Sequence, residues 1–394
     1  MRILGMISGT SVDAIDVALA DMYQVDDTLT LTTLGYLELP WPAAVRERLL
    51  AALPPASPGP AEWVRLHAET GEAFGAAAAR ALTELGPADL VVSHGQTLHH
   101  LVERGRVVGT LQLGDPARVH AHTGLPVLAD LRAADIAAGG QGAPLASTLD
   151  ALWLGDVPTA AVNLGGIANV TIVGTDDGPV TGDTGPANCL LDAAAADLGL
   201  RCDVDGALAA AGRVDEAALG ALLADPYFAR PLPKSTGREH FHAGYVRQML
   251  GAATPTGPDL FTTLVELSAR TIADVVRRHR PRRLVVSGGG VANPLLIQRL
   301  SRLTGLQPSD CLGLPAAAKE AYLMALIGWL SWHGLPGVAR GPAGPVTGAA
   351  RAAVLGSLTP PRAVADLAPA PTRLVVEAAG AGAGARSETG GGRL

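Results

Sequence analysis

The chain has 394 residues, which is more than a single core usually supports, so we expect two domains with a ligand cleft between them. Its formal net charge of −7, with 30 lysines and arginines against 37 acidic residues, leaves no basic stripe for a nucleic-acid backbone and argues against a nucleic-acid partner. Its three cysteines are too few and too scattered for a disulfide framework or a zinc cluster, which favours reduced thiols and a cytoplasmic protein.

The first element expected from the N-terminus is a β-hairpin. The apolar run 3–7 predicts a strand, residues 8–11 a tight polar turn, and the alternation over 12–19 a second strand. The turn offers a glycine for close approach of a ligand, two hydroxyls, and two carboxylates whose hard oxygens suit Mg²⁺ or its waters. These residues are Gly9, Thr10, Ser11, Asp13 and Asp16. The ending of a P-loop is missing, so the segment is interpreted either as another kind of phosphate cradle or as a plain surface hairpin.

The middle of the chain alternates helix and strand patterns. Helices are predicted over 41–52, 61–85, 189–196, 260–278 and 294–303, and buried strands over 90–93, 125–129 and 284–287. Residues 94–97 are expected to form a polar turn after their strand, a position where open α/β sheets hold ligands. The block 159–173 has the same plan as the first hairpin, with a glycine turn between apolar stretches. That similarity indicates a duplicated two-lobe fold.

Three further features concern burial, secretion and order. The longest apolar run, 321–332, is too short to cross a bilayer and predicts a buried helix or a subunit interface rather than a membrane span. Polar residues from position 8 onward interrupt the N-terminal apolar stretch, so no secretory signal is expected. Residues 361–394 are rich in alanine, proline and glycine, which predicts a disordered tail.

Seven motifs stand in one order along the chain. They occupy residues 5–18, 93–97, 130–145, 163–171, 183–188, 234–239 and 287–293. Together they resemble the anhydro-N-acetylmuramic acid kinase family of the sugar kinase, Hsp70 and actin superfamily, over residues 1 to about 360. The resemblance implies an α/β, two-lobe actin-like ATPase fold, with mixed sheets flanked by helices and an active site in the interlobe cleft. Lobe I would comprise residues 1–127 and 347–360, and lobe II residues 128–346.

The resemblance also implies an activity. Members of the family use ATP, Mg²⁺ and water to convert 1,6-anhydro-N-acetylmuramic acid into N-acetylmuramic acid 6-phosphate, in the recycling of cell-wall peptidoglycan. They tend to form homodimers. Two rivals stay open: a kinase of another sugar with the same fold, and a non-catalytic nucleotide-dependent sensor.

Site residues follow from the matching motifs. Asp183 is expected to be the base that activates water, with the capping of a helix near Pro186 as the structural alternative. The resemblance implies that ATP contacts Gly9, Thr10, Ser11, Val12, Asp13, Ala14, Ile15, Asp16, Gly165, Gly166, Gly288, Gly289, Gly290 and Asn293. The sugar is expected to contact His94, Gln96, Arg132, Asp135 and Glu320. Mg²⁺ would be held mainly through ATP phosphates and water, with no certain protein ligand.

Several of these residues have a second interpretation. Arg132 and Asp135 could form an exposed ion pair, which would contribute little. His94 lies near two further histidines, but no carboxylate spacing supports zinc, so hydrogen bonding is favoured. The motif 234–239 has either a structural or a pocket-edge role. The chain departs from the family in having Gly182 where an aromatic residue is usual and Ala187 where a glycine is usual, and both changes affect the backbone around Asp183.

Overall fold

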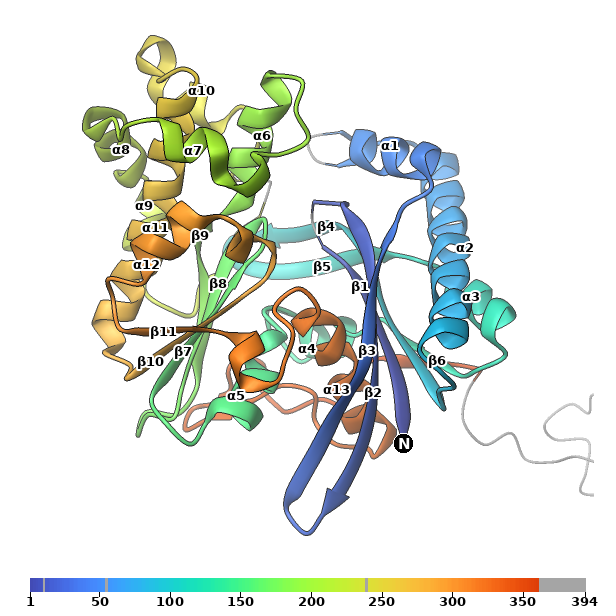
Figure 1. The fold of residues 1–394 in the computed structure, drawn as a ribbon. Helices are drawn as coiled ribbons and strands as arrows, with labels where there is room; N and C mark the ends of the chain where they lie inside the picture. The colour runs from blue at the N-terminus through green and yellow to red at the C-terminus, as the bar shows by residue number, and fades with distance from the viewer. Residues whose placement is uncertain (10, 54–55, 238–239, 361–394) are drawn as a thin grey trace, which may run out of the picture. The chain divides into compact units, whose positions relative to one another are not determined.

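The computed structural model describes residues 1–9, 11–53, 56–237 and 240–360. Residues 1–360 form one compact unit by their contacts. The predicted tail at 361–394 lies outside the described residues. Two mixed β-sheets with helices packed against them make up this unit (Figure 1), so the α/β class with mixed sheets flanked by helices is confirmed.

The larger sheet has seven strands in the described residues and is built around the N-terminal strand. The strand order is β14-β6-β4-β1-β2-β3, and β5 pairs with β4 outside this path. β1 runs parallel to β4 and antiparallel to β2, so the predicted first hairpin is confirmed. The strands are β1 (Arg2–Ser8), β2 (Ala14–Val25), β3 (Thr28–Pro40), β4 (Leu90–Glu103), β5 (Arg106–Leu113), β6 (Val127–Ala129) and β14 (Ser357–Thr359).

The smaller sheet has the order β11-β10-β7-β8-β9. β11, β10 and β7 are parallel, and β7, β8 and β9 are antiparallel. The strands are β7 (Thr159–Leu164), β8 (Ile167–Val173), β9 (Val180–Pro186), β10 (Arg283–Ser287) and β11 (Gly305–Pro308), and a separate pair is formed by β12 (Arg340–Gly341) and β13 (Gly344–Pro345). The β7–β8 hairpin repeats the plan of β1–β2, as the sequence similarity predicts.

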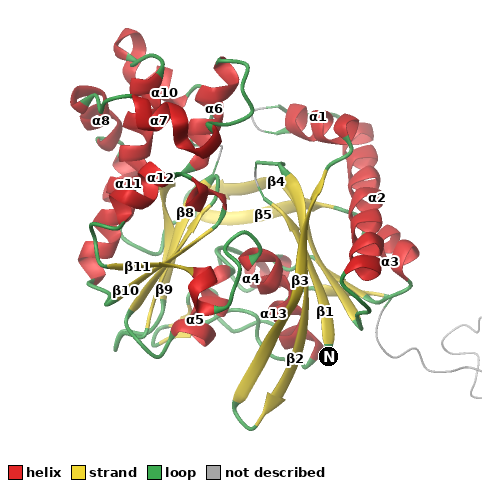
Figure 2. Ribbon diagram, in the orientation of Figure 1, coloured by secondary structure: helices red, strands yellow, loops and turns green. Residues whose placement is uncertain are grey.

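Helices cover both sheets (Figure 2). They are α1 (Ala43–Ala52), α2 (Pro60–Glu84), α3 (Pro116–Thr123), α4 (Ala133–Ala137), α5 (Ala146–Leu154), α6 (Asn188–Asp197), α7 (Ala207–Ala211), α8 (Glu216–Leu223), α9 (Pro226–Ala229), α10 (Tyr245–Leu250), α11 (Pro258–His279), α12 (Pro294–Leu300) and α13 (Lys319–Trp332). Short 3₁₀ helices span Val204–Gly206, Gly251–Ala253, Gly289–Ala292 and Ser309–Leu312. None of the helices in the described part combines the length and apolar character needed to cross a membrane.

Strand β1 is buried on both faces. Its side chains alternate, so Leu4 and Met6 pack with α2 while Ile3 and Ile7 pack with α13. α13 is buried along most of its length within this core, which confirms the predicted buried helix at 321–332 and rejects the subunit-interface alternative.

Gly5 of β1 allows α13 to approach the sheet closely. A Cβ at this position would lie 2.0 Å from the Ala321 carbonyl oxygen and 2.6 Å from the Ala325 nitrogen, both in the backbone of α13. We expect Gly5→Ala to lower the free energy of unfolding by about 3 kcal/mol, because the helix must shift in a packed core. Urea unfolding measures this. Gly220→Ala, in an open position of α8, is the matched control and should be neutral or stabilising; equal effects of the two changes would contradict the explanation.

The turn predicted at 94–97 is wrong, because β4 continues through these residues to Glu103 and finds an antiparallel partner in β5. The lobe boundaries stay a prediction. β14 belongs to the seven-stranded sheet together with the N-terminal strands, which agrees with a lobe I of residues 1–127 and 347–360, and β6 of the same sheet lies at the predicted boundary. In contrast, α13 packs on that sheet although its residues fall within the predicted lobe II.

Candidate active site

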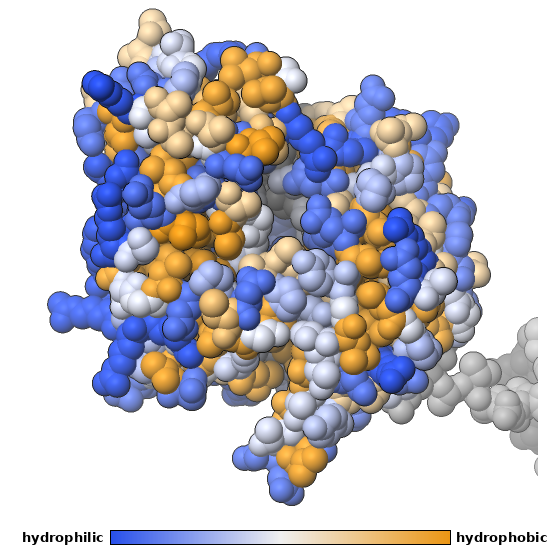
Figure 3. Space-filling model, in the orientation of Figure 1, coloured by the Kyte–Doolittle hydropathy of each residue, from blue (hydrophilic) through white to orange (hydrophobic). Residues whose placement is uncertain are grey.

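A cavity of about 390 Å³ is lined by residues of both sheets. Its walls come from the β1–β2 turn, β4, the loop 143–146, the β7–β8 turn, β9, the loop 235–237, the turn 288–289 and the first residues of α13. Figure 3 shows this face of the molecule hollowed between the elements of the larger sheet and those of the smaller sheet. Sites for small molecules commonly have volumes of roughly 300–1,000 Å³.

Most of the residues predicted from the motifs meet at this cavity. Those lining it are Gly9, Ser11, Asp13, Ala14, Asp16, His94, Arg132, Gly165, Gly166, Asp183, Gly288, Gly289 and Glu320. Those not among the lining residues are Val12, Ile15, Gln96, Asp135, Gly290 and Asn293. Thr10 lies outside the described residues. Segments more than three hundred residues apart in the sequence therefore contribute to one site.

Asp183 lies within β9, and its surroundings hold both its backbone and its carboxylate. The Thr236 amide donates a hydrogen bond of 2.9 Å to Asp183 Oδ2. The Asp183 amide donates to the Lys234 carbonyl at 2.8 Å, and the Tyr227 hydroxyl donates to the Asp183 carbonyl at 2.8 Å. The N-cap of α6 is Ala187, so the alternative in which Asp183 caps this helix is wrong.

The two departures from the family motif have structural consequences here. A Cβ at Gly182 would lie 2.7 Å from the Lys234 carbonyl oxygen, so the segment around Lys234 packs directly against β9. Ala187 has a φ of −116°, outside the left-handed region that favours glycine. Its amide donates to the Gly166 carbonyl at 2.9 Å, which joins the start of α6 to the second glycine turn.

Buried His94 and half-buried Arg132 form a hydrogen-bonded pair. Arg132 Nε donates to His94 Nε2 at 2.9 Å, and Arg132 Nη1 donates to the Gly142 carbonyl at 2.7 Å. Because a guanidinium only donates, His94 Nε2 accepts, and the proton stands on Nδ1, 3.2 Å from the Gly95 carbonyl. Burial, followed by the charge of Arg132, lowers the pKa of His94 to about 3, so the imidazole is neutral.

The side chain of Asp135 is buried and accepts hydrogen bonds from uncharged groups. It accepts from the Gly142 amide at 2.7 Å and from the Thr347 hydroxyl at 2.7 Å. The alternative of an exposed ion pair with Arg132 is therefore not what the structure has. Gln96 donates at 3.1 Å to the carbonyl of Gly9, which lines the cavity, whereas Asn293 accepts from the first amides of α12 and so caps that helix.

Carboxylates gather at one end of the cavity. Burial, followed by the negative charges of Glu320, Glu38 and Asp13, raises the pKa of Asp16 to about 7. Burial also raises the pKa of Glu320, against the charges of Arg132 and Lys319. Among the residues that the structure describes, no group of three or more His, Cys, Asp or Glu side chains is placed to hold a metal ion by itself.

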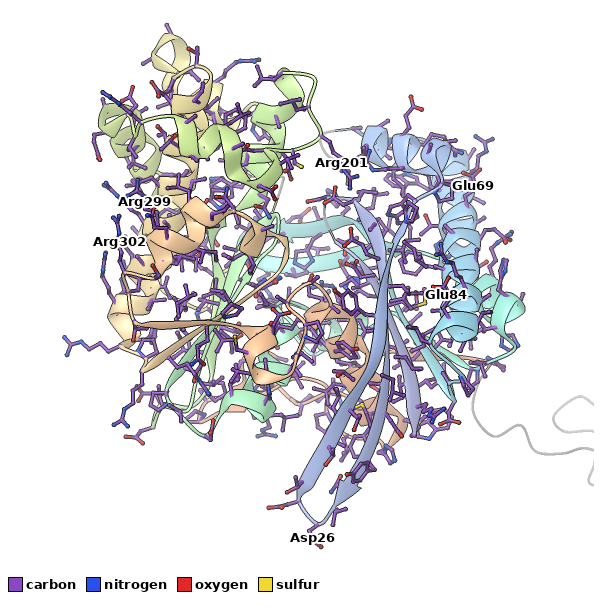
Figure 4. All side chains as sticks on the ribbon, in the orientation of Figure 1. Asp26, Glu69, Glu84, Arg201, Arg299 and Arg302 are labelled. Carbon is purple, nitrogen blue, oxygen red and sulfur yellow. The ribbon has the colours of Figure 1, made fainter. Side chains whose placement is uncertain are left out.

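Three charged residues at this end were missed by the sequence analysis. Glu38 on β3 lies opposite Asp16 on β2, a register that only the folded sheet reveals. Arg46 of α1 and Arg201 of the loop after α6 lie 3.8 Å and 4.0 Å from Asp13. Figure 4 shows Arg201 reaching from its loop toward the side of α1. No sequence spacing connects these arginines with Asp13.

Two hairpins whose glycine turns face one cavity, beside a carboxylate on a neighbouring strand, are typical of an α/β phosphotransferase, which must hold a phosphate donor and an acceptor together. The family model described as "Anhydro-N-acetylmuramic acid kinase" matches residues 1–361. The chain belongs to the anhydro-N-acetylmuramic acid kinase family, as the resemblance predicts.

Named relatives agree with the family. The anhydro-N-acetylmuramic acid kinase of Streptomyces avermitilis is 52% identical over 393 residues, covering 96% of this chain and 100% of the relative. That of Streptomyces coelicolor is 50% identical, with 92% and 94% covered. Among solved structures, the xylulose kinase from Rhodospirillum rubrum aligns with 83% of this chain and 90% of its own, at 14% identity and a TM-score of 0.38, a likeness too weak to bear on function.

Proposed function

We propose that the protein is an ATP-dependent kinase that opens the 1,6-anhydro ring of anhydro-N-acetylmuramic acid and phosphorylates the released 6-hydroxyl. Family membership supports this assignment. The observation that carries it is the Asp183 carboxylate, which is oriented by the Thr236 amide and lines the same cavity as both glycine turns. A cytoplasmic location and a homodimer remain predictions.

In the proposed reaction, Asp183 removes a proton from a water molecule that attacks the anomeric carbon C1 of the sugar. The C1–O6 bond breaks as the new C1–O bond forms. The released O6 bonds to the γ-phosphorus of ATP, the bond between the β- and γ-phosphates breaks, and ADP leaves. The proton held by Asp183 passes to solvent. The protein's contribution to phosphoryl transfer is positioning and charge neutralisation.

The glycine turns are the proposed ATP site. Gly9 and Ser11 of the first turn and Gly165 and Gly166 of the second line the same cavity, where backbone amides can face phosphate oxygens. Asp16 fits Mg²⁺, since it offers hard oxygen donors, and its pKa is raised by burial and then by the neighbouring carboxylates, both of which a divalent cation would offset. When bound, Mg²⁺ would neutralise phosphate charge, held mainly by the phosphates and water.

The sugar is proposed to lie beside His94, Arg132 and Glu320. Arg132 is held on two sides, by His94 and by the Gly142 carbonyl, so its guanidinium is oriented before a ligand arrives. A carboxylate such as the lactyl group of the sugar is the natural partner of this cation. Gln96 and Asp135, predicted as sugar contacts, are instead proposed to support the walls of the pocket.

The test is to incubate the protein with ATP, Mg²⁺ and the anhydro-sugar and to identify the products. ADP and a 6-phosphorylated reducing sugar are expected. In ¹⁸O-labelled water the label should appear on C1, which separates hydrolytic ring opening from ordinary phosphorylation of a free hexose. Folded protein that yields no such product would refute the proposal, and product without label on C1 would refute the role of water.

Arg132→Lys should weaken sugar binding selectively. A lysine keeps the positive charge, but it lacks the planar guanidinium. That group can bond to His94 and to the Gly142 carbonyl and still present N–H groups to a carboxylate of the sugar. We expect the KM for the sugar to rise about 10- to 100-fold, the loss of one or two charged hydrogen bonds, with a much smaller change for ATP. Steady-state kinetics with each substrate varied in turn measures both. A parallel rise in the two KM values would show that Arg132 acts on the whole site instead.

A further inference from the structure

The chain uses lysine sparingly. Of its 30 lysines and arginines only two, Lys234 and Lys319, are lysines. Both are buried, with 6% and 3% of their surface exposed. Lysine carries a compact ammonium with three donors, whereas arginine carries a wide planar fork. A chain that uses arginine nearly everywhere else therefore keeps lysine at two places where a compact buried cation fits.

Lys234 joins two segments that both contact Asp183. Its ammonium donates to the Tyr227 carbonyl at 3.0 Å and to the Phe228 carbonyl at 3.3 Å, and it lies 4.4 Å from the centroid of the Tyr227 ring. A cation over an aromatic face is attracted to it, more strongly where water is excluded. The side chain thus ties the loop that begins at residue 234 to the helix α9.

Both α9 and the loop that begins at residue 234 form hydrogen bonds with Asp183. From α9, the Tyr227 hydroxyl reaches the Asp183 carbonyl, and from the loop, the Lys234 carbonyl and the Thr236 amide reach the Asp183 amide and carboxylate. The absence of a side chain at Gly182 lets the loop lie directly on the strand. The position of the carboxylate therefore depends on how firmly the loop and α9 are held together.

The α9 side of this connection is rigid. Asp225 accepts from the Tyr227 amide at 2.8 Å, from His240 Nε2 at 2.8 Å and from the Tyr245 hydroxyl at 3.0 Å. Burial alone would raise the pKa of Asp225, but these hydrogen bonds outweigh it and hold the pKa below its usual value. The fixed Tyr227 is therefore an anchor, and the Lys234 ammonium fastens the loop to that anchor.

We propose that Lys234 is a positioning residue that holds Asp183 in the orientation needed to activate water, acting through Tyr227 and the loop 234–236. The inference rests on the proposed function, in which Asp183 is the base. Lys234 need not touch either substrate, and its removal should slow the chemical step without weakening the binding of ATP or sugar.

The charge of Lys234 gives the inference a pH signature. Burial, followed by the charges of Arg230 and Arg278, lowers the pKa of Lys234 to about 8, against the opposing charge of Asp183. The groups that face it are Tyr227 and Arg230 on or beside α9, Arg278 on α11 and Asp183 on β9. The ammonium is charged below this pH and neutral above it. Once neutral, it loses its attraction to the Tyr227 ring, so kcat should fall as the pH rises past about 8.

The experiment compares Lys234→Met with the unsubstituted full-length chain. We expect kcat to fall about 10- to 100-fold, as for a catalytic group displaced by up to about 1 Å, with both KM values within about twofold. The decline above pH 8 should vanish in the variant. Arg230→Met is the matched control, since Arg230 is exposed and its Cζ lies 5.5 Å from the same ring. It should keep kcat, and its decline should move to higher pH because Arg230 lowers the pKa of Lys234.

Further measurements keep the test decisive. If Lys234→Met does not fold, Lys234→Gln takes its place, because it retains N–H donors for the two carbonyls without a charge. The decline of kcat above pH 8 should be absent in this variant too. Hydrogen exchange of the Asp183 and Thr236 amides, measured without substrates, should speed up in either variant. A kcat within about threefold of the unsubstituted chain, or a loss confined to KM, overturns the inference. An inactive unsubstituted chain would refute the proposed function instead, while the exchange rates would still report on the link between Lys234 and Asp183.

Discussion

Asp183→Asn is expected to lower kcat about 10²- to 10⁴-fold, the usual contribution of a general base. Asparagine has nearly the same shape, and its carbonyl oxygen can still accept the hydrogen bond that Thr236 donates at 2.9 Å to Asp183 Oδ2. The variant therefore keeps this hydrogen bond of β9, while it loses the negative charge and with it the ability to take a proton from water. Release of ADP and formation of the 6-phosphorylated sugar measure the loss.

Binding must be separated from chemistry in this variant. The glycine turns at residues 9 and 165–166 are untouched by the change, so the Kd for ATP should stay within about twofold of the unsubstituted value, as for a site that has lost no contact. Asp26→Asn makes the same chemical change at the tip of the β2–β3 hairpin, far from the cavity (Figure 4), and should leave kcat unchanged. If Asp183→Asn retained more than about a tenth of kcat, Asp183 could not be the base.

The parts of the fold that follow local rules could be predicted from the sequence. The first hairpin and the β7–β8 hairpin have apolar runs broken by glycine, and α11 and α13 have long apolar patterns. The polar residues 94–97 misled the prediction, because they look like a turn. They continue β4 because β1 pairs as far as Gln96 and β5, folded back from residue 106, supplies further hydrogen bonds for an extended backbone.

The site divides in a similar way. Asp183, His94 and Arg132 were predicted because each stands in a motif, and the folded chain brings them to one cavity. Glu38 and Tyr227 were not assigned a role, and the motif 234–239 was given only a structural or pocket-edge role, since these residues reach the site through strand register and loop packing that no local pattern encodes. Gln96 and Asp135 lie in the right motifs, but their side chains bond to the backbone and to Thr347 beside the cavity, a difference that only side-chain geometry reveals.

The second lysine should have the largest effect on stability. Lys319 Nζ lies 2.6 Å from Asp150 Oδ1, and the two side chains are 3% and 1% exposed. This ion pair joins the start of α13, which packs on the larger sheet, to α5, which packs beside the smaller one. We expect Lys319→Met to lower the free energy of unfolding by about 3–5 kcal/mol, because it leaves the Asp150 carboxylate buried without its cation. Urea unfolding, followed by fluorescence and by circular dichroism, measures the change.

The cost should come from the stranded charge rather than from the loss of the pair itself. The double variant Lys319→Met, Asp150→Leu removes both charges and should recover most of the lost stability, since apolar residues of similar volume often replace a buried pair at little cost. Arg247→Met breaks an ion pair of 2.8 Å with Asp197, where both side chains are mostly exposed, and should cost at most about 1 kcal/mol. Equal losses at Lys319 and Arg247 would contradict the argument from burial. Because Glu320 follows Lys319 in the first turn of α13 and lines the cavity, a shift of this helix should also raise the KM for the sugar in Lys319→Met, and the double variant should restore it.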